Sequence, residues 1–128
     1  MIKVYVTKQS NYPIRATKVK SYLRKILQEN GIVSDTYVYV GFVGEKRMKA
    51  LAERYLGEKD KLHSVLSFPE NEIKKEFVYP DNTIRLGDII LCYPLIVDRA
   101  KKDNMLIDDK VNELVEHGAM HLLGQHHN

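Results

Sequence analysis

Leu86-Gly-Asp-Ile-Ile-Leu-Cys-Tyr93 is the stretch of sequence that decides the fold. The run is nearly all apolar, which is typical of a strand buried on both faces at the centre of a sheet. Apolar residues that alternate or are branched indicate three more strands, over residues 2–6, 36–43 and 64–68. We therefore expect a sheet of four strands with this stretch in its middle.

Apolar residues at helical spacing predict four helices, over residues 15–29, 44–56, 94–102 and 108–123. Asp108 or Asp109 is the expected N-cap of the last helix. Residues 70–83 are polar and are expected to form mostly loop. The order of the elements predicts an α+β fold, in which a small four-stranded mixed sheet is packed with helices in one domain over residues 1–128.

The overall composition is that of a globular protein. Of the 128 residues, 44% are apolar and 29% are charged, which excludes a disordered chain and a membrane protein. The net charge of +3 permits a nucleic-acid partner without requiring one. The first residues lack the apolar stretch of a signal peptide, and no apolar run is long enough to cross a bilayer. We expect a cytoplasmic monomer with no membrane association.

The only cysteine, Cys92, lies within the apolar stretch quoted above. A single cysteine cannot form an internal disulfide, so a reducing compartment fits the sequence. The strand-forming neighbours of Cys92 favour a buried, small apolar side chain over a nucleophile.

Four of the five histidines lie in the last twelve residues, His117-Gly-Ala-Met-His-Leu-Leu-Gly-Gln-His-His-Asn128. His117 and His121 are four residues apart on the last predicted helix, so their rings leave one face of that helix one turn apart. Two imidazoles placed in this way can bind one ion at about 2.0–2.1 Å. The pair therefore predicts that the C-terminal helix binds a metal.

A third ligand is expected from the residues that follow this helix. Gly124 can take a positive φ at the helix end and reverse the chain, which gives His127 a route to the ion. His126 is the competing ligand, or a proton donor beside the site. Three histidines leave a fourth tetrahedral position for water, as in catalytic zinc sites. We predict one Zn²⁺ on His117, His121 and His127, a set that would also bind nickel or copper.

The same spacing of histidines also occurs in metzincin proteases. Those enzymes need a glutamate directly after the first histidine, as the general base of peptide hydrolysis. Here that residue is Gly118. A peptidase of that type is therefore not expected.

Residues 117–127 resemble the signature of the YbeY family, which is usually written H-G-x-L-H-L-x-G-Y-D-H. Upstream, Val65-Leu-Ser-Phe-Pro69 is similar to the family's V-L-S-F-P segment, and Tyr55-Leu-Gly-Glu-Lys-Asp60 precedes it. Gly87-Asp88-Ile89 is similar to the family's G-D-I strand. The order and spacing of these segments agree over essentially the whole chain.

The resemblance implies a single-domain, metal-dependent endoribonuclease. Such an enzyme acts in ribosomal RNA maturation, particularly at the 3′ end of 16S rRNA, and in ribosome quality control. Zinc is implied on the three motif histidines, which fall on His117, His121 and His127 here. The implied partners are RNA, above all ribosomal RNA, and the small ribosomal subunit with its proteins.

Two departures from the family pattern bear on the candidate site. Gln125-His126 stands where the family has Tyr-Asp, so the carboxylate that would orient a ligand or move a proton is missing there. Leu56 stands where the family often has arginine, and Arg54 is the candidate catalytic and RNA-binding substitute, with a solvated helix arginine as the other interpretation. The candidates for contacts with RNA phosphates are Arg54, Lys59 and Lys61 and, further along the chain, Lys46 and Arg47.

The sequence leaves the general base open. The titratable candidates are Asp88, Glu113, Glu116 and His126. We expect cleavage of single-stranded RNA, with water on the metal or a nearby 2′-hydroxyl as the nucleophile. Two alternatives stay open: a ribosome-assembly factor in which the metal only braces the C-terminus, and a zinc hydrolase of another substrate.

Overall fold

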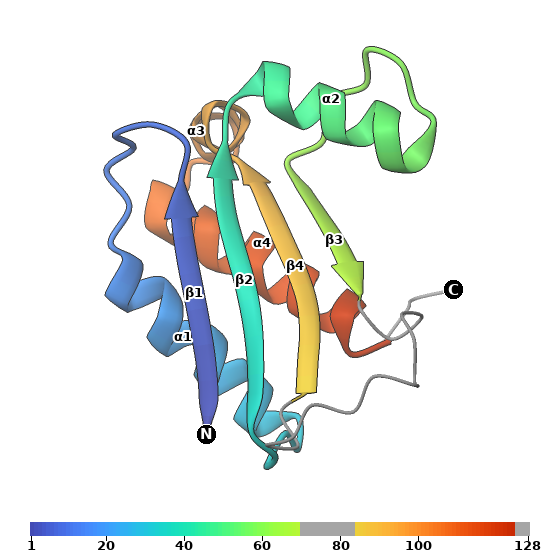
Figure 1. Ribbon diagram of the computed structural model, residues 1–128. Helices are drawn as coiled ribbons and strands as arrows, with labels where there is room; N and C mark the ends of the chain where they lie inside the picture. Colours follow the sequence, from blue (N-terminus) through green and yellow to red (C-terminus); the bar gives the residue numbers. More distant parts are fainter. Residues whose placement is uncertain (70–83, 125–128) are drawn as a thin grey trace.

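The computed structural model describes residues 1–69 and 84–124 and contains strands and helices in the predicted order (Figure 1). The elements are β1 (Ile2–Lys8), α1 (Ala16–Glu29), β2 (Thr36–Val43), α2 (Glu45–Leu56), β3 (Val65–Pro69), β4 (Ile84–Cys92), α3 (Tyr93–Lys102) and α4 (Ile107–Leu122). The expected loop over 70–83 lies outside the described residues.

The four strands form one mixed sheet in the order β1-β2-β4-β3. β1, β2 and β4 are parallel, and β3 pairs with β4 in the antiparallel sense. β4 therefore has a neighbour on each side, which confirms the central position predicted for residues 86–93. The mixed α+β sheet expected from the sequence is confirmed as well.

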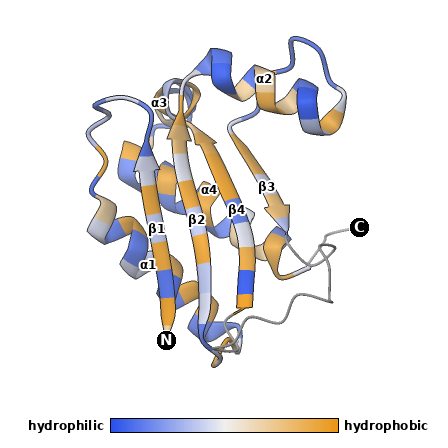
Figure 2. Cartoon of the chain, viewed as in Figure 1, coloured by the Kyte–Doolittle hydropathy of each residue, from blue (hydrophilic) through white to orange (hydrophobic). Residues whose placement is uncertain are grey.

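The main core lies between one face of the sheet and helices α1 and α4, which cover the far face in Figure 1. Val38, Ile89 and Leu91 point into this core from the strands. Figure 2 shows hydrophilic bands that interrupt the hydrophobic strands β1 and β4. The alternation follows from the two-residue period of a strand, which sends every second side chain to the other face.

A second, smaller core lies on the opposite face of the sheet. Met48 and Leu51 of α2 pack there against Leu66 of β3 and Cys92 of β4. Cys92 is fully buried, and this burial raises the pKa of its thiol above the usual value. The prediction of a buried apolar cysteine is therefore confirmed.

The N-terminus of α4 differs from its prediction. The helix begins at Ile107, and the capping position is occupied by Leu106, which makes no side-chain hydrogen bond to the helix. The predicted N-caps Asp108 and Asp109 were placed wrongly, because both lie within the first turn. There their negative charges interact favourably with the positive end of the helix dipole.

None of the helices in residues 1–69 and 84–124 has the length and apolar character that crossing a bilayer requires.

Candidate active site

His117 and His121 project from the C-terminal half of α4. Their ring centroids are 4.6 Å apart, with the ring planes tilted by 58°. This separation is compatible with one ion bound to a nitrogen of each ring at about 2.0–2.1 Å. His117 is exposed and His121 is half-buried, so the pair lies at the border of the core with access for a substrate.

The turn after α4 has the predicted geometry as far as the chain is described. Gly124 has a φ of 77° and donates its N–H to the carbonyl of His121 at 3.0 Å. A positive φ at this position reverses the chain at a helix end. The predicted third ligand His127, and the competing His126, lie outside the described residues. Within residues 1–69 and 84–124, no cluster of three or more metal-binding side chains occurs.

Close packing of α4 on the sheet sets the position of the histidines. A Cβ atom added to Gly118 would lie 2.8 Å from Cγ2 of Ile89, which is closer than two carbon atoms can approach without strain. Gly118 therefore lets the helix approach the central strand closely. A glutamate at this position, as in a metzincin protease, would have to displace Ile89.

A hollow of about 330 Å³ adjoins His117 at the edge of the sheet. Its volume lies at the lower end of the usual range for ligand pockets, roughly 300–1,000 Å³. The hollow is lined by Ser64, Val65, Arg99, Asp103, Lys110, Glu113, Leu114 and His117. The hollow therefore adjoins one of the two candidate metal ligands.

A buried lysine fixes one wall of this hollow. Lys110 Nζ donates hydrogen bonds to Asp103 Oδ2 and Glu113 Oε2, each at 2.6 Å. These hydrogen bonds lower the pKa of the Asp103 carboxyl and raise the pKa of Lys110. The interaction of Lys110 with Asp103 could not be predicted from the sequence. Lysine side chains are usually exposed, and Asp103 lies at the end of another helix, α3.

The described candidates for the general base have different surroundings. Glu113 lies on the wall of the hollow, one helical turn before His117. Glu116 accepts a hydrogen bond from the Tyr22 hydroxyl at 3.2 Å. Asp88 lies 3.5 Å from Arg85 and, by strand alternation, on the sheet face opposite Ile89 and α4. Of these carboxylates, Glu113 is the one that shares a hollow with a candidate ligand.

The candidate cation Arg54 lies on α2, whose core is on the opposite side of the sheet from α4. Its guanidinium carbon is 5.3 Å from the ring centroid of Tyr55. The Tyr55 ring contacts Phe68 of β3, with centroids 5.1 Å apart. The other candidates on this helix, Lys46 and Arg47, are exposed in its first turn.

Lys59 and Lys61 lie in the loop between α2 and β3, and both are exposed. Lys61 Nζ is 3.7 Å from the carboxylate of Glu58. His63 Nε2 is 2.6 Å from the other oxygen of that carboxylate. The hydrogen bond with His63, supported by the charge of Lys61, lowers the pKa of Glu58. His63 therefore belongs to a local cluster with Glu58 and Lys61.

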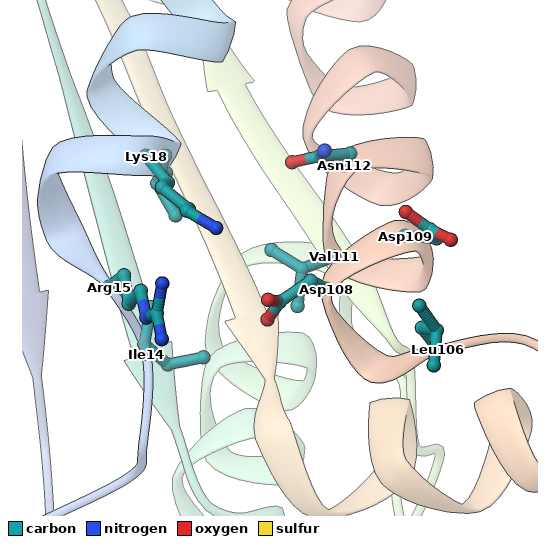
Figure 3. Close-up of a pocket in the computed structure, with 9 residues that line it drawn as sticks. Ile14, Arg15, Lys18, Leu106, Asp108, Asp109, Val111 and Asn112 are labelled. Atoms are coloured by element: carbon teal, nitrogen blue, oxygen red, sulfur yellow. The ribbon is translucent and has the colours of Figure 1, made fainter.

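Another hollow, of about 280 Å³, lies between the N-terminal ends of α1 and α4 (Figure 3). Arg15, the residue before α1, and Lys18 of α1 face Asp108 of α4 across it, with Asp109 and Asn112 nearby. This hollow is at the end of α4 that is far from His117 and His121. The positive charges on one side of this hollow face negative charges on the other. We assign the hollow no part in the candidate active site.

Comparison with known proteins agrees with the motifs. The family profile described as Endoribonuclease YbeY matches residues 5–128. A protein named Endoribonuclease YbeY from Acinetobacter baumannii is 28% identical over 114 residues, which cover 89% of this chain and 71% of that protein. Its namesake from Macrococcus caseolyticus is 32% identical over 100 residues, which cover 78% of this chain and 64% of that protein.

The fold agrees with a solved structure as well. The solution structure of a Thermotoga maritima protein superposes with a TM-score of 0.59 at 26% identity, covering 98% of this chain and 75% of that one. The family profile and the named relatives indicate the same family, and the fold is consistent with it. The chain belongs to the YbeY family of endoribonucleases, which are hydrolases that act on RNA.

Proposed function

We propose that this protein is a zinc-dependent endoribonuclease that cleaves single-stranded RNA at the hollow beside His117. One observation carries the proposal: in a chain of an endoribonuclease family, His117, whose ring centroid lies 4.6 Å from that of His121, borders a hollow of about 330 Å³. The family resemblance supports a role in the maturation of the 16S rRNA 3′ end and in ribosome quality control.

The donor set fits zinc. His117 and His121 would supply two nitrogens, and His127 the third, with one coordination position left for a water molecule. When bound, the ion supplies Lewis-acid chemistry, which activates an attacking hydroxyl and offsets the negative charge that develops on the phosphoryl group. The half-buried position of His121 helps to hold its ring in one orientation.

The charged groups of the hollow have complementary tasks in this proposal. Arg99 provides a cation for a phosphate of the RNA chain. Glu113, held by Lys110, provides a carboxylate in a fixed place that can accept a proton from the attacking group. Arg54, Lys59 and Lys61 would contact phosphates farther along the strand, without reading its sequence.

The proposal extends to partners and location. Ribosomal RNA and the small ribosomal subunit with its proteins are the proposed partners, as the family resemblance implies. We propose a cytoplasmic enzyme that acts as a monomer. The single, fully buried cysteine fits a reducing compartment.

The test compares RNA cleavage by the wild type with cleavage by His121→Ala, each purified with metal analysis. His63→Ala serves as the matched control, because it removes a histidine whose ring nitrogen contacts Glu58. We expect cleavage by the wild type and the control, and loss of cleavage in His121→Ala. Equal cleavage by all three would identify a contaminating nuclease. A wild type that carries zinc and binds ribosomal subunits but never cleaves would favour the assembly-factor alternative.

A further inference from the structure

The sheet face opposite α1 and α4 carries a cluster of tyrosines outside the site described above. The register of the strands places Lys3, Tyr37 and Arg85 in one row and Tyr5, Tyr39 and Asp88 in the next. These six residues are called the tyrosine face. α2 packs on this side of the sheet at Leu66 and Cys92, and in the described chain no other helix lies on it (Figure 1).

The tyrosine rings are clustered and accessible to solvent. Tyr5 and Tyr39 stack on each other with centroids 4.9 Å apart, and Tyr37 packs edge-on against both. Tyr5 is 42% exposed and Tyr39 is 38% exposed. Aromatic rings contribute most when they are buried, so a preformed, exposed group of them marks a binding surface.

A hollow of about 390 Å³ lies next to these rings. The lack of a side chain at Gly41 keeps part of this hollow open. A Cβ atom at that position would lie 3.3 Å from Ile90 and 3.5 Å from Thr7. The volume falls within the usual range for small-ligand pockets, and it can accommodate a flat ring beside Tyr39. The hollow is lined by Thr7, Tyr37, Tyr39, Val40, Gly41, Arg85, Asp88 and Ile90.

We propose that the tyrosine face binds the single-stranded RNA substrate by stacking bases on Tyr5 and Tyr39. The inference rests on the proposed nuclease function, because it names how the substrate strand is held. Open sheets with exposed aromatic side chains bind single-stranded RNA in this way, and stacking tolerates any base. The charge suits a polyanion: Asp88 forms an ion pair with Arg85 at 3.5 Å, and Lys3 leaves the face with one net positive charge.

The tyrosine face leads toward the histidine pair. The row of Tyr5, Tyr39 and Asp88 ends at Phe68 in edge strand β3, a distance of three strand spacings or about 14 Å. A Cβ atom added to Gly87 would touch both the carbonyl of Phe68 and the side chain of Leu122. Leu122 directly follows His121 on α4. A strand of RNA that crosses the sheet along this row therefore reaches edge strand β3, and the end of α4 that carries the candidate ligands lies against that strand from the other side of the sheet.

Affinity for a short, fluorescently labelled oligoadenylate, measured by anisotropy, tests the proposal. Gel electrophoresis checks that the probe stays intact. The Tyr5→Ala/Tyr39→Ala double variant should bind about tenfold more weakly or worse. The Tyr5→Phe/Tyr39→Phe variant keeps both rings and should bind like the wild type. Leu106→Ala, at an exposed apolar residue between α3 and α4, is the control. Retention of affinity in the double alanine variant would overturn the proposal.

Photo-crosslinking locates the RNA even if a variant fails to fold. The wild type is irradiated with an oligonucleotide that contains 4-thiouridine and is then digested with trypsin. Tyr5 is the only aromatic residue of the tryptic peptide Val4–Lys8, so a crosslink on that peptide supports the tyrosine face. Crosslinks confined to peptides of α1 or α3 would contradict it.

The outcomes separate this inference from the nuclease function. A wild type that binds RNA through the tyrosines and cleaves none would contradict the nuclease and support the tyrosine face. If the wild type cleaves RNA and the double alanine variant keeps full affinity for RNA, the nuclease function is supported and the tyrosine face is contradicted. If the wild type is a dimer that the double variant dissociates, with unchanged RNA affinity, the face binds a second copy of the chain and the proposal is wrong.

Discussion

Gly118 of α4 lies directly on Ile89 of the central strand, so close that a Cβ atom on the glycine would be 2.8 Å from Ile89 Cγ2. The glycine directly follows His117, and three residues later His121 leaves the same helix. Ile89 is fully buried in the main core. The contact between helix and strand thus sets the depth at which the histidine pair lies.

Replacing Gly118 by alanine is expected to destabilise the protein. The added methyl group overpacks the core, which costs about 1–3 kcal/mol, since the branched Ile89 side chain is stiff at χ1. The better helix propensity of alanine offsets roughly 1 kcal/mol of that cost. Urea unfolding of wild type and Gly118→Ala measures the difference in the free energy of unfolding.

A double-mutant cycle with Ile89→Ala provides the control for this prediction. Removing the Ile89 side chain leaves space for the new methyl group, so Gly118→Ala should cost less in the Ile89→Ala background. An equal cost in both backgrounds would show that the contact with Ile89 is not the cause.

Gly87→Ala is expected to be more damaging. Gly87 has a φ of 141°, which L side chains rarely adopt, and a Cβ atom there would meet the carbonyl oxygen of Phe68 at 2.4 Å. Backbone strain and overpacking together predict a loss of about 2–5 kcal/mol in the free energy of unfolding. Urea unfolding measures it, and a loss below that of Gly118→Ala would contradict the close approach of β3 to β4.

The order of elements could be predicted because each strand and helix carries its own period of apolar residues. β4 is central because its apolar run is long and has few polar interruptions, and the histidine pair follows from a spacing of four on a helix. The ion pairs of Lys110 could not be predicted in full. Glu113 is three residues away on the same helix, but Asp103 is brought there by the fold.

The cluster of tyrosines on the open face of the sheet could not be predicted from the sequence either. Tyr5 and Tyr39 alternate with buried residues, as strand side chains on the less covered face do. Their stacking depends on the register between β1 and β2, which no local pattern specifies. The prediction of His127 as a ligand remains a prediction, because this residue lies outside the part of the chain described.

The cluster of Lys110 with Asp103 and Glu113 predicts a dependence of stability on pH. The pKa of Asp103 is lower in the folded protein than its ordinary value of 3.8. The ion pair of Asp103 therefore stabilises the fold above pH 3.8, and this stabilisation is lost as the pH falls through the lower folded pKa. The pKa of Lys110 is higher in the folded protein than its ordinary value of 10.5. The ion pairs of Lys110 therefore stabilise the fold below pH 10.5, and this stabilisation is lost as the pH rises through the higher folded pKa.

Asp103→Asn should therefore destabilise the protein at pH 7 and have little effect in strong acid, well below pH 3.8. Urea unfolding at both pH values measures this difference. Asp98→Asn, at an exposed residue of α3, is the matched control and should show little change at either pH. An Asp103→Asn effect of the same size in acid would contradict the ion pair.

Arg54→Ala is expected to weaken the binding of single-stranded RNA with only a small change in the free energy of unfolding, from the lost contact with the Tyr55 ring. The arginine is exposed on α2, and a lost phosphate contact lowers the slope of log affinity against log salt by about 1. Lys25→Ala, at an exposed residue of α1, is the control. An unchanged salt slope in Arg54→Ala would show that Arg54 makes no contact with phosphate.

The measurement that tests the central claim most directly is the zinc stoichiometry and affinity of the reconstituted protein, by elemental analysis and titration calorimetry. One zinc ion per wild-type chain is predicted, with affinity largely lost in His117→Ala, His121→Ala and His127→Ala and retained in His63→Ala. His126→Ala should keep the ion if His127 is the third ligand. A wild type that binds no zinc after reconstitution, or a His121→Ala variant that binds it as tightly as the wild type, would contradict the account.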